Sequence, residues 1–132
     1  MTTKTKKIIA WILTGIVGFI FIGSGTVKLS GSEDAIQMAD GMGINISTLF
    51  SLGILELIAA VLFIIPRTGM LGTLLLIAYM GGAMATHIVL GESFFFPALI
   101  QVFVWIVASI RFPELPQRML NGSKRRRQPE LN

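Results

Sequence analysis

Cysteine is absent from this chain of 132 residues, and histidine occurs once, as His87. Without cysteine the chain cannot form disulfides, thiol nucleophiles, iron–sulfur clusters or c-type haem attachments. A single histidine excludes a bis-histidine haem within one chain. Charged residues are scarce, at 14% against about 25% in an ordinary soluble domain, whereas 53% of the residues are apolar. A chain this short cannot bury so much apolar surface in a water-soluble core, so the composition predicts a membrane protein.

Four apolar stretches each have the length of a transmembrane helix, because about twenty helical residues match a hydrocarbon core about 30 Å thick. They cover about residues 8–28, 48–65, 69–87 and 94–111. Three lysines precede the first stretch, which makes a secretory signal peptide the competing interpretation. However, the stretch is longer than a typical signal core, and further spans follow. The predicted fold class is therefore an all-α integral membrane protein, a four-transmembrane-helix bundle forming one domain over residues 8–116.

A polar segment, Ser30–Asn45, separates the first two stretches. Ser30 or Ser32 can cap a short helix with two acids in its first turn, and the helix would end near Gly41 or Gly43. Its apolar side would consist of Ala35, Met38, Ala39 and Met42. We expect a short amphipathic helix that lies on the membrane surface.

The basic residues are distributed unevenly around the four predicted spans. With a cytoplasmic N-terminus (residues 1–7), one side holds Lys4, Lys6, Lys7, Arg67, Arg111, Arg118, Lys124, Arg125, Arg126 and Arg127, and the other holds only Lys28. The positive-inside rule then predicts that both termini are cytoplasmic, and we expect a bacterial cytoplasmic (inner) membrane. The tail, residues 117–132, is predicted to be a disordered cytoplasmic segment. Its basic cluster is expected to contact anionic lipids rather than nucleic acid.

Each predicted span carries a polar side chain on a face that also holds small residues. On the first span this stripe consists of Thr14, Gly18, Phe21, Gly25 and Lys28. Small residues let helices approach closely in lipid, where packing drives association. Glu56 lies between Gly53 and Ala60, so we expect it to pair with Lys28 inside the bundle.

Five residues, Lys28, Glu56, His87, Gln101 and Tyr79, are the candidates for ligand binding or proton relay in the outer half of the bundle. A carboxylate near mid-membrane costs about 2.5–3.5 kcal/mol on insertion scales, so Glu56 persists only if it is paired, protonated or facing water. The alternatives are structural. Glu56, His87 and Gln101 would then form hydrogen bonds between helices, and the Lys28 ammonium would reach the membrane–water interface. A metal site would need more ligands than one histidine and one glutamate, so none is expected.

Several short motifs along the chain resemble those of the DoxX-like membrane proteins. They are Gly25-Thr26-Val27-Lys28-Leu29, Glu56-Leu57, Pro66-Arg67-Thr68, Gly72, Tyr79-Met80-Gly81-Gly82-Ala83, Ala85-Thr86-His87 and Phe94-Phe95-Phe96-Pro97. Their order and spacing carry the resemblance, which covers about residues 8–116. It implies a four-helix membrane fold.

Some relatives in this family are described as membrane subunits of quinone-linked or redox complexes. The resemblance therefore implies an association with redox chemistry. Our first hypothesis is an accessory subunit that binds a small lipophilic ligand such as a quinone between the helices. The sequence has no motif for a bound redox centre, so we expect no covalent cofactor and no enzyme activity of the chain on its own. Its expected partners are the lipid bilayer, a redox-enzyme protein and further copies of itself. Two alternatives stay open: a non-catalytic scaffold that recruits a partner, and a small oligomeric transporter.

Overall fold

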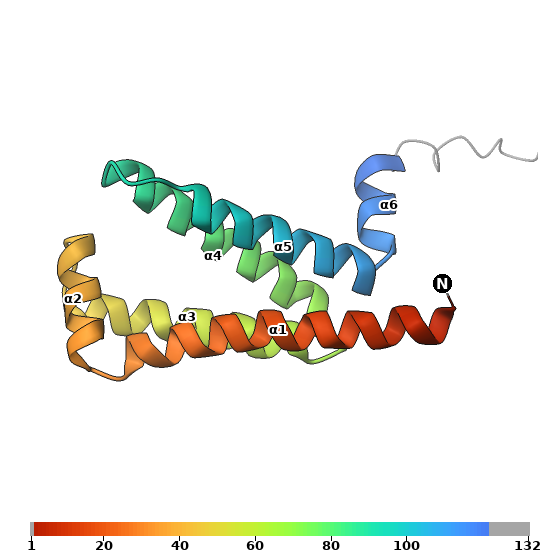
Figure 1. The fold of residues 1–132 in the computed structure, drawn as a ribbon, viewed down its shortest axis with the longest axis horizontal. Helices are drawn as coiled ribbons and strands as arrows, with labels where there is room; N and C mark the ends of the chain where they lie inside the picture. Colours follow the sequence, from red (N-terminus) through yellow and green to blue (C-terminus); the bar gives the residue numbers. More distant parts are fainter. Residues whose placement is uncertain (1, 122–132) are drawn as a thin grey trace, which may run out of the picture.

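The computed structural model describes residues 2–121, which are largely helical and contain no strand (Figure 1). The helices are α1 (Thr3–Leu29), α2 (Glu33–Met42), α3 (Ile46–Ile64), α4 (Gly69–Val89), α5 (Phe95–Arg111) and α6 (Glu114–Asn121). The four long helices coincide with the predicted stretches, and the predicted all-α membrane bundle is confirmed. α1 begins before its apolar stretch because the Thr2 side chain accepts a hydrogen bond from the Thr5 backbone N–H and caps the helix.

Three of these helices, α1, α3 and α4, are long and apolar enough to cross a membrane. α5 has 17 residues, at the short end of the range of about 17–25 residues for a spanning helix. It is followed after a 103° bend by α6, and the number of spans is four if this bent pair counts as one. The chain is an integral membrane protein.

The helices form two antiparallel pairs that diverge toward one end of the molecule (Figure 1). α1 packs along α3, α3 packs on α4, and α5 contacts both α4 and α1. α2 lies across the end where the pairs diverge, and its main contacts are with α1 and α3. We call this the α2 end. The opposite end, which holds the start of α1 and the short helix α6, is called the α6 end.

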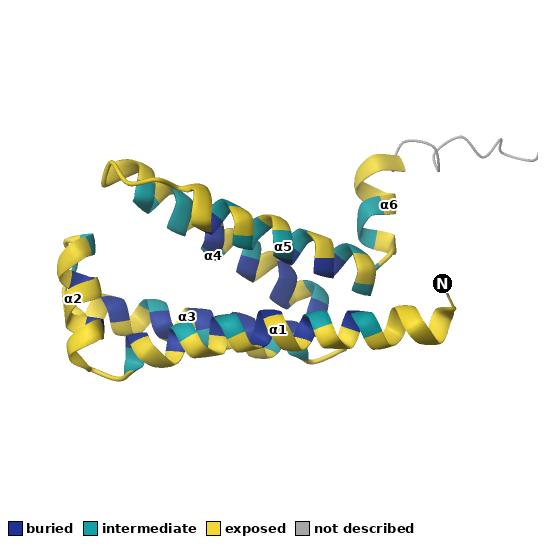
Figure 2. Ribbon diagram, viewed as in Figure 1, coloured by how far each residue is buried: buried dark blue, intermediate teal, exposed yellow. Residues whose placement is uncertain are grey.

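Buried residues face inward along the four long helices, and the outer faces are exposed and apolar (Figure 2). The central core includes Val17, Phe21, Phe63, Leu76 and Val104. The exposed outer residues include large apolar side chains such as Phe19, Phe95 and Val89. In water such a surface would be strongly unfavourable, so its apolar character fits contact with lipid.

The short helix between the first two spans follows its predicted pattern. Ser32 is its N-cap and accepts a hydrogen bond from the Ala35 backbone N–H, and Gly43 ends it with a φ of 69°. Its buried residues, Ala35 and Ala39, pack with Leu49 in a small cluster separate from the central core. α2 is therefore held at the end of the bundle by a small core of its own.

At the α6 end the prediction of a disordered tail from residue 117 is wrong for residues 117–121, because they complete α6. That prediction rested on the polar composition of the tail. However, Pro116 lies in the first turn of α6, where a backbone N–H has no partner within the helix. The rest of that tail, residues 122–132 with the basic cluster, lies outside the described residues.

Arg111 joins three helices at the α6 end. Its guanidinium donates hydrogen bonds to the backbone oxygens of Phe63 and Ile64, the second at 3.0 Å, in the last turn of α3. It also lies over the rings of Trp11, Phe63 and Phe112, at 5.2, 5.1 and 5.0 Å from their centroids. The last carbonyls of a helix have no partner within it, so Arg111 satisfies those of α3 while its charge contacts aromatic faces.

Candidate functional site

A close approach of α1 and α3 positions the polar residues at the α2 end. Gly25 and Gly53 face each other, and a Cβ added to Gly53 would lie 3.0 Å from the Gly25 carbonyl oxygen and 2.9 Å from Lys28 Cβ. Only glycine leaves room for this approach. Lys28 follows Gly25 by one turn and Glu56 follows Gly53 by one turn, so the two charged side chains meet directly beside the crossing point.

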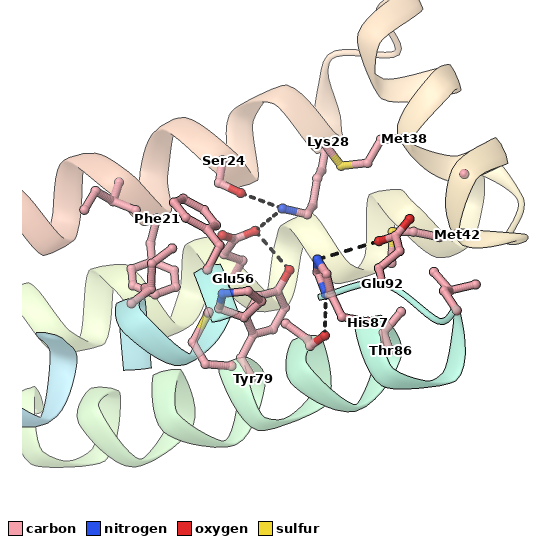
Figure 3. A pocket seen from close by; sticks show the side chains of 18 residues that line it. Phe21, Ser24, Lys28, Met38, Met42, Glu56, Tyr79, Thr86, His87 and Glu92 are labelled. Atoms are coloured by element: carbon pink, nitrogen blue, oxygen red, sulfur yellow. Dashed lines mark hydrogen bonds and ion pairs between the residues drawn. The ribbon is translucent and has the colours of Figure 1, made fainter. Parts of the chain in front are cut away.

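Lys28 and Glu56 form a buried ion pair, and the predicted pairing is confirmed. Lys28 Nζ lies 2.7 Å from Glu56 Oε2, and the two residues are only 9% and 2% exposed. Lys28 Nζ also donates to Ser24 Oγ at 2.6 Å, and the Tyr79 hydroxyl donates to Glu56 Oε2 at 3.1 Å (Figure 3). Residues of α1, α3 and α4 therefore meet at one carboxylate oxygen, and the charges are neutralised and hydrogen-bonded as buried charges require.

His87 lies nearer the end of the bundle than this pair (Figure 3). Its Nδ1 lies 2.7 Å from the Ala83 backbone oxygen. A carbonyl oxygen can only accept, so Nδ1 carries a proton, and Nε2 of the neutral ring is an acceptor. Nε2 faces Glu92 Oε2 at 3.9 Å, and both side chains are partly exposed. The two side chains form an ion pair only when Nε2 also carries a proton.

A cavity of about 500 Å³ opens beside the Lys28–Glu56 pair and His87, within the usual range of about 300–1,000 Å³ for a small-molecule site. The polar residues that line it are Ser24, Lys28, Glu56, Tyr79, Thr86, His87 and Glu92. Most of the remaining wall is apolar and includes Phe21, Met38, Met42, Met80, Phe96 and Ile100. α1, α2, α3, α4 and α5 all contribute to it, so the cavity exists only in the assembled bundle.

The whole chain was also compared with known proteins. A model of the DoxX-like family matches residues 12–109, well over half of the chain. The chain belongs to the DoxX-like family. Comparisons with curated proteins and with solved structures found no match. The part that matches the DoxX-like model contains every residue that lines the cavity, whereas α6 lies outside it.

Four of the five predicted site residues of this DoxX-like protein, Lys28, Glu56, Tyr79 and His87, line the same cavity. Gln101 does not. The lining residues of α5 are Phe96, Pro97 and Ile100, and the Gln101 side-chain oxygen is buried without a hydrogen-bond partner among residues 2–121. The spacing of residues along the fourth apolar stretch predicted which face of the helix carries Gln101. It did not predict whether Gln101 lies at the same level of the bundle as the cavity.

Sequence reasoning did not assign Ser24 or Glu92 to the site. Ser24 lies one turn before Lys28, and i,i+4 spacing was the available signal for their hydrogen bond. Glu92 follows His87 by five residues in the turn after α4, and only the path of that turn brings it near the imidazole. Within residues 2–121 no three His, Cys, Asp or Glu side chains lie close enough together to hold a metal ion.

Proposed function

We propose that this DoxX-like membrane protein binds a small lipophilic molecule in the cavity at the α2 end. The observation that carries the proposal is the combination of apolar walls with buried or partly buried polar residues that converge from three helices. Small-molecule sites commonly have this composition, in which apolar walls supply affinity and a few polar groups fix orientation. A ligand would place its polar head against Lys28, Glu56 and Tyr79 and its apolar part between the methionines and phenylalanines.

A quinone is the first candidate for this ligand, and the protein would serve as an accessory subunit of a redox complex. The cavity suits a molecule that is mainly apolar and has a polar edge. The sequence has no cysteine and one histidine, so its residues supply no iron–sulfur ligands or haem pair, and electrons would come from a partner protein. Glu56 and His87 would supply or remove protons when the ligand changes oxidation state.

The orientation that goes with this function places the cavity in the outer half of a bacterial cytoplasmic membrane, with both termini inside. The uneven distribution of basic residues supports it. Because the chain lacks cysteine, single cysteines can be introduced at Thr3, Ser32 and Ser93 and labelled in intact cells with an impermeant thiol reagent. Labelling at Ser32→Cys and Ser93→Cys, without Thr3→Cys, is expected. The reverse pattern would place the cavity at the inner side.

The binding function is tested by purifying the protein in mild detergent and identifying the molecules that remain with it by mass spectrometry. We expect one lipophilic species in roughly equal molar amount to the protein, together with a redox partner protein. An unrelated membrane protein of similar size, purified from the same cells, serves as the control. If the two preparations contain the same molecules in the same amounts, the proposal is wrong.

A further inference from the structure

The buried part of the cavity carries no net charge. The Lys28 ammonium and the Glu56 carboxylate lie 2.7 Å apart and are both buried. Three other titratable residues line the cavity. Tyr79 keeps its proton, because its hydroxyl donates to Glu56, and His87 and Glu92 lie closer to the mouth and are partly exposed, so water screens them. A ligand head that reaches the Lys28–Glu56 pair therefore meets two charges that already neutralise each other.

A charged head group would bind poorly at such a place. Leaving water costs an ion several kcal/mol in real proteins, and only a close, uncompensated opposite charge offsets this cost. Here the attraction of a carboxylate to Lys28 would be opposed by repulsion from Glu56, and an ammonium would meet the opposite balance. An uncharged head avoids both penalties.

The hydrogen bonds within the pair leave both a donor and an acceptor unused. An ammonium has three N–H donors, and Lys28 uses two of them, to Ser24 and Glu56. Glu56 Oε2 accepts from both Lys28 and Tyr79, which leaves Oε1 of the same carboxylate without a donor from the described part of the chain. A single hydroxyl group can accept from the first and donate to the second.

We propose that the cavity selects an uncharged lipophilic alcohol or phenol, whose hydroxyl accepts a hydrogen bond from Lys28 and donates one to Glu56. The inference rests on the proposed ligand-binding function and narrows its chemistry. The hydroxyl-bearing, reduced form of a quinone belongs to this class. Fatty acids and long-chain amines, which have similar apolar parts but charged heads, do not.

Three probes that share one alkyl chain test this selectivity: decanol, decanoate and decylamine. Each is added at the same mole fraction to nanodiscs of zwitterionic phospholipid that contain the protein, and binding is measured by native mass spectrometry and by the rise in unfolding temperature. We expect decanol to bind at least about tenfold more tightly than either charged probe, a difference of about 1.4 kcal/mol. Equal or tighter binding of decanoate or decylamine would overturn the inference.

Replacing one partner of the Lys28–Glu56 pair should change which probe binds most tightly, and the two replacements should favour probes of opposite charge. Glu56→Gln leaves Lys28 uncompensated and should make decanoate the tightest probe, whereas Lys28→Met leaves Glu56 and should favour the decylammonium ion. The double variant is again neutral and should prefer decanol, which keeps the test usable if a single variant does not fold. Glu33→Gln and Lys7→Met remove the same charges from exposed positions outside the cavity and should keep the wild-type order.

The outcomes separate this inference from the broader function. If the folded wild-type protein binds none of the three probes, the ligand-binding function and the inference both fail. If it binds them in another order, or if the double variant prefers a charged probe, only the inference fails.

Discussion

The two ends of the bundle each contain a buried or half-buried basic residue, yet they differ in what surrounds it. At the α2 end Lys28 pairs with a side-chain carboxylate beside a cavity of about 500 Å³. At the α6 end Arg111 donates to two backbone oxygens of α3, and three aromatic rings surround its guanidinium. Lys28 retains an unused donor next to an open cavity, whereas the hydrogen bonds of Arg111 go to backbone oxygens at the end of a helix.

This difference shows that a charge inside a membrane bundle is not by itself a sign of function. Intramembrane charges are costly and so are functional candidates by default. Arg111 offsets the cost of its charge by satisfying the end of a helix, which is a structural role. The Lys28–Glu56 pair is also buried between helices, but it lines the cavity in which we propose that a ligand binds. The cavity of about 500 Å³ beside the Lys28–Glu56 pair distinguishes the two cases.

The largest effect is expected near the α6 end, where α3 and α4 are pressed together. A Cβ on Gly72 would overlap the backbone of Phe63 and Leu62, and backbone atoms cannot move aside as flexible side chains do. Gly72→Ala should therefore destabilise the protein by more than about 5 kcal/mol, which exceeds what most single substitutions cost. Gly81→Ala is the control, because nothing lies within 4 Å of a Cβ there. Similar unfolding temperatures for both variants in detergent would show that α3 and α4 are not in this close contact.

The next largest effect concerns the pair at the α2 end. Lys28→Met or Glu56→Gln removes one partner of a buried ion pair and should cost about 3–5 kcal/mol. Because the double variant leaves no unpaired charge, it should lose less than the sum, with a coupling energy of at least about 1 kcal/mol. A double-mutant cycle on unfolding in detergent measures this coupling, and strictly additive costs would reject the pair.

Arg111→Gln should destabilise the protein by about 2–3 kcal/mol, because it removes hydrogen bonds to a charged donor and contacts with aromatic faces. Unlike the changes in the pair, it should leave ligand affinity unchanged in protein that remains folded. Arg118→Gln, on the exposed face of α6, should leave the unfolding temperature almost unchanged. A loss of ligand affinity in Arg111→Gln, with stability intact, would show that Arg111 acts in ligand binding rather than in stabilising the bundle.

His87→Ala should have the smallest effect on stability, below about 1 kcal/mol, because the side chain is partly exposed and its main partner is one backbone oxygen. Its effect on ligand binding should be larger, since Nε2 is an acceptor at the cavity mouth. Binding of the co-purified ligand is measured beside the unfolding temperature. A large loss of stability with unchanged binding would make His87 a structural residue.

The sequence predicted the faces of the helices better than their relative depth. The Thr14–Lys28 stripe is buried in α1, and Glu56 faces it from α3, because a 3.6-residue period and small residues determine which side packs inward. Gln101 lies outside the cavity, since the lateral offset between packed helices depends on contacts along their whole length.

The sequence also did not predict the contacts that Arg111 makes. Its place at the end of an apolar stretch is typical of a charge in a cytoplasmic loop, and nothing nearby in sequence shows that α3 ends beside it. The partner oxygens belong to Phe63 and Ile64, 48 and 47 residues earlier. Only the assembled bundle brings such groups together. Pairs close in sequence, such as Ser24 and Lys28, were within reach of spacing arguments.

The most direct test of the ligand site is to fill the cavity without changing its charges. Ala83 lines the cavity from α4, and Ala85 lies on the exposed side of the same helix. Ala83→Trp and Ala85→Trp therefore make the same substitution two residues apart, and unfolding temperatures in detergent confirm that both variants fold. Mass spectrometry then measures the lipophilic molecule retained by each protein. The wild type and Ala85→Trp should retain it and Ala83→Trp should lose it, whereas equal retention by both tryptophan variants would contradict a ligand site in this cavity.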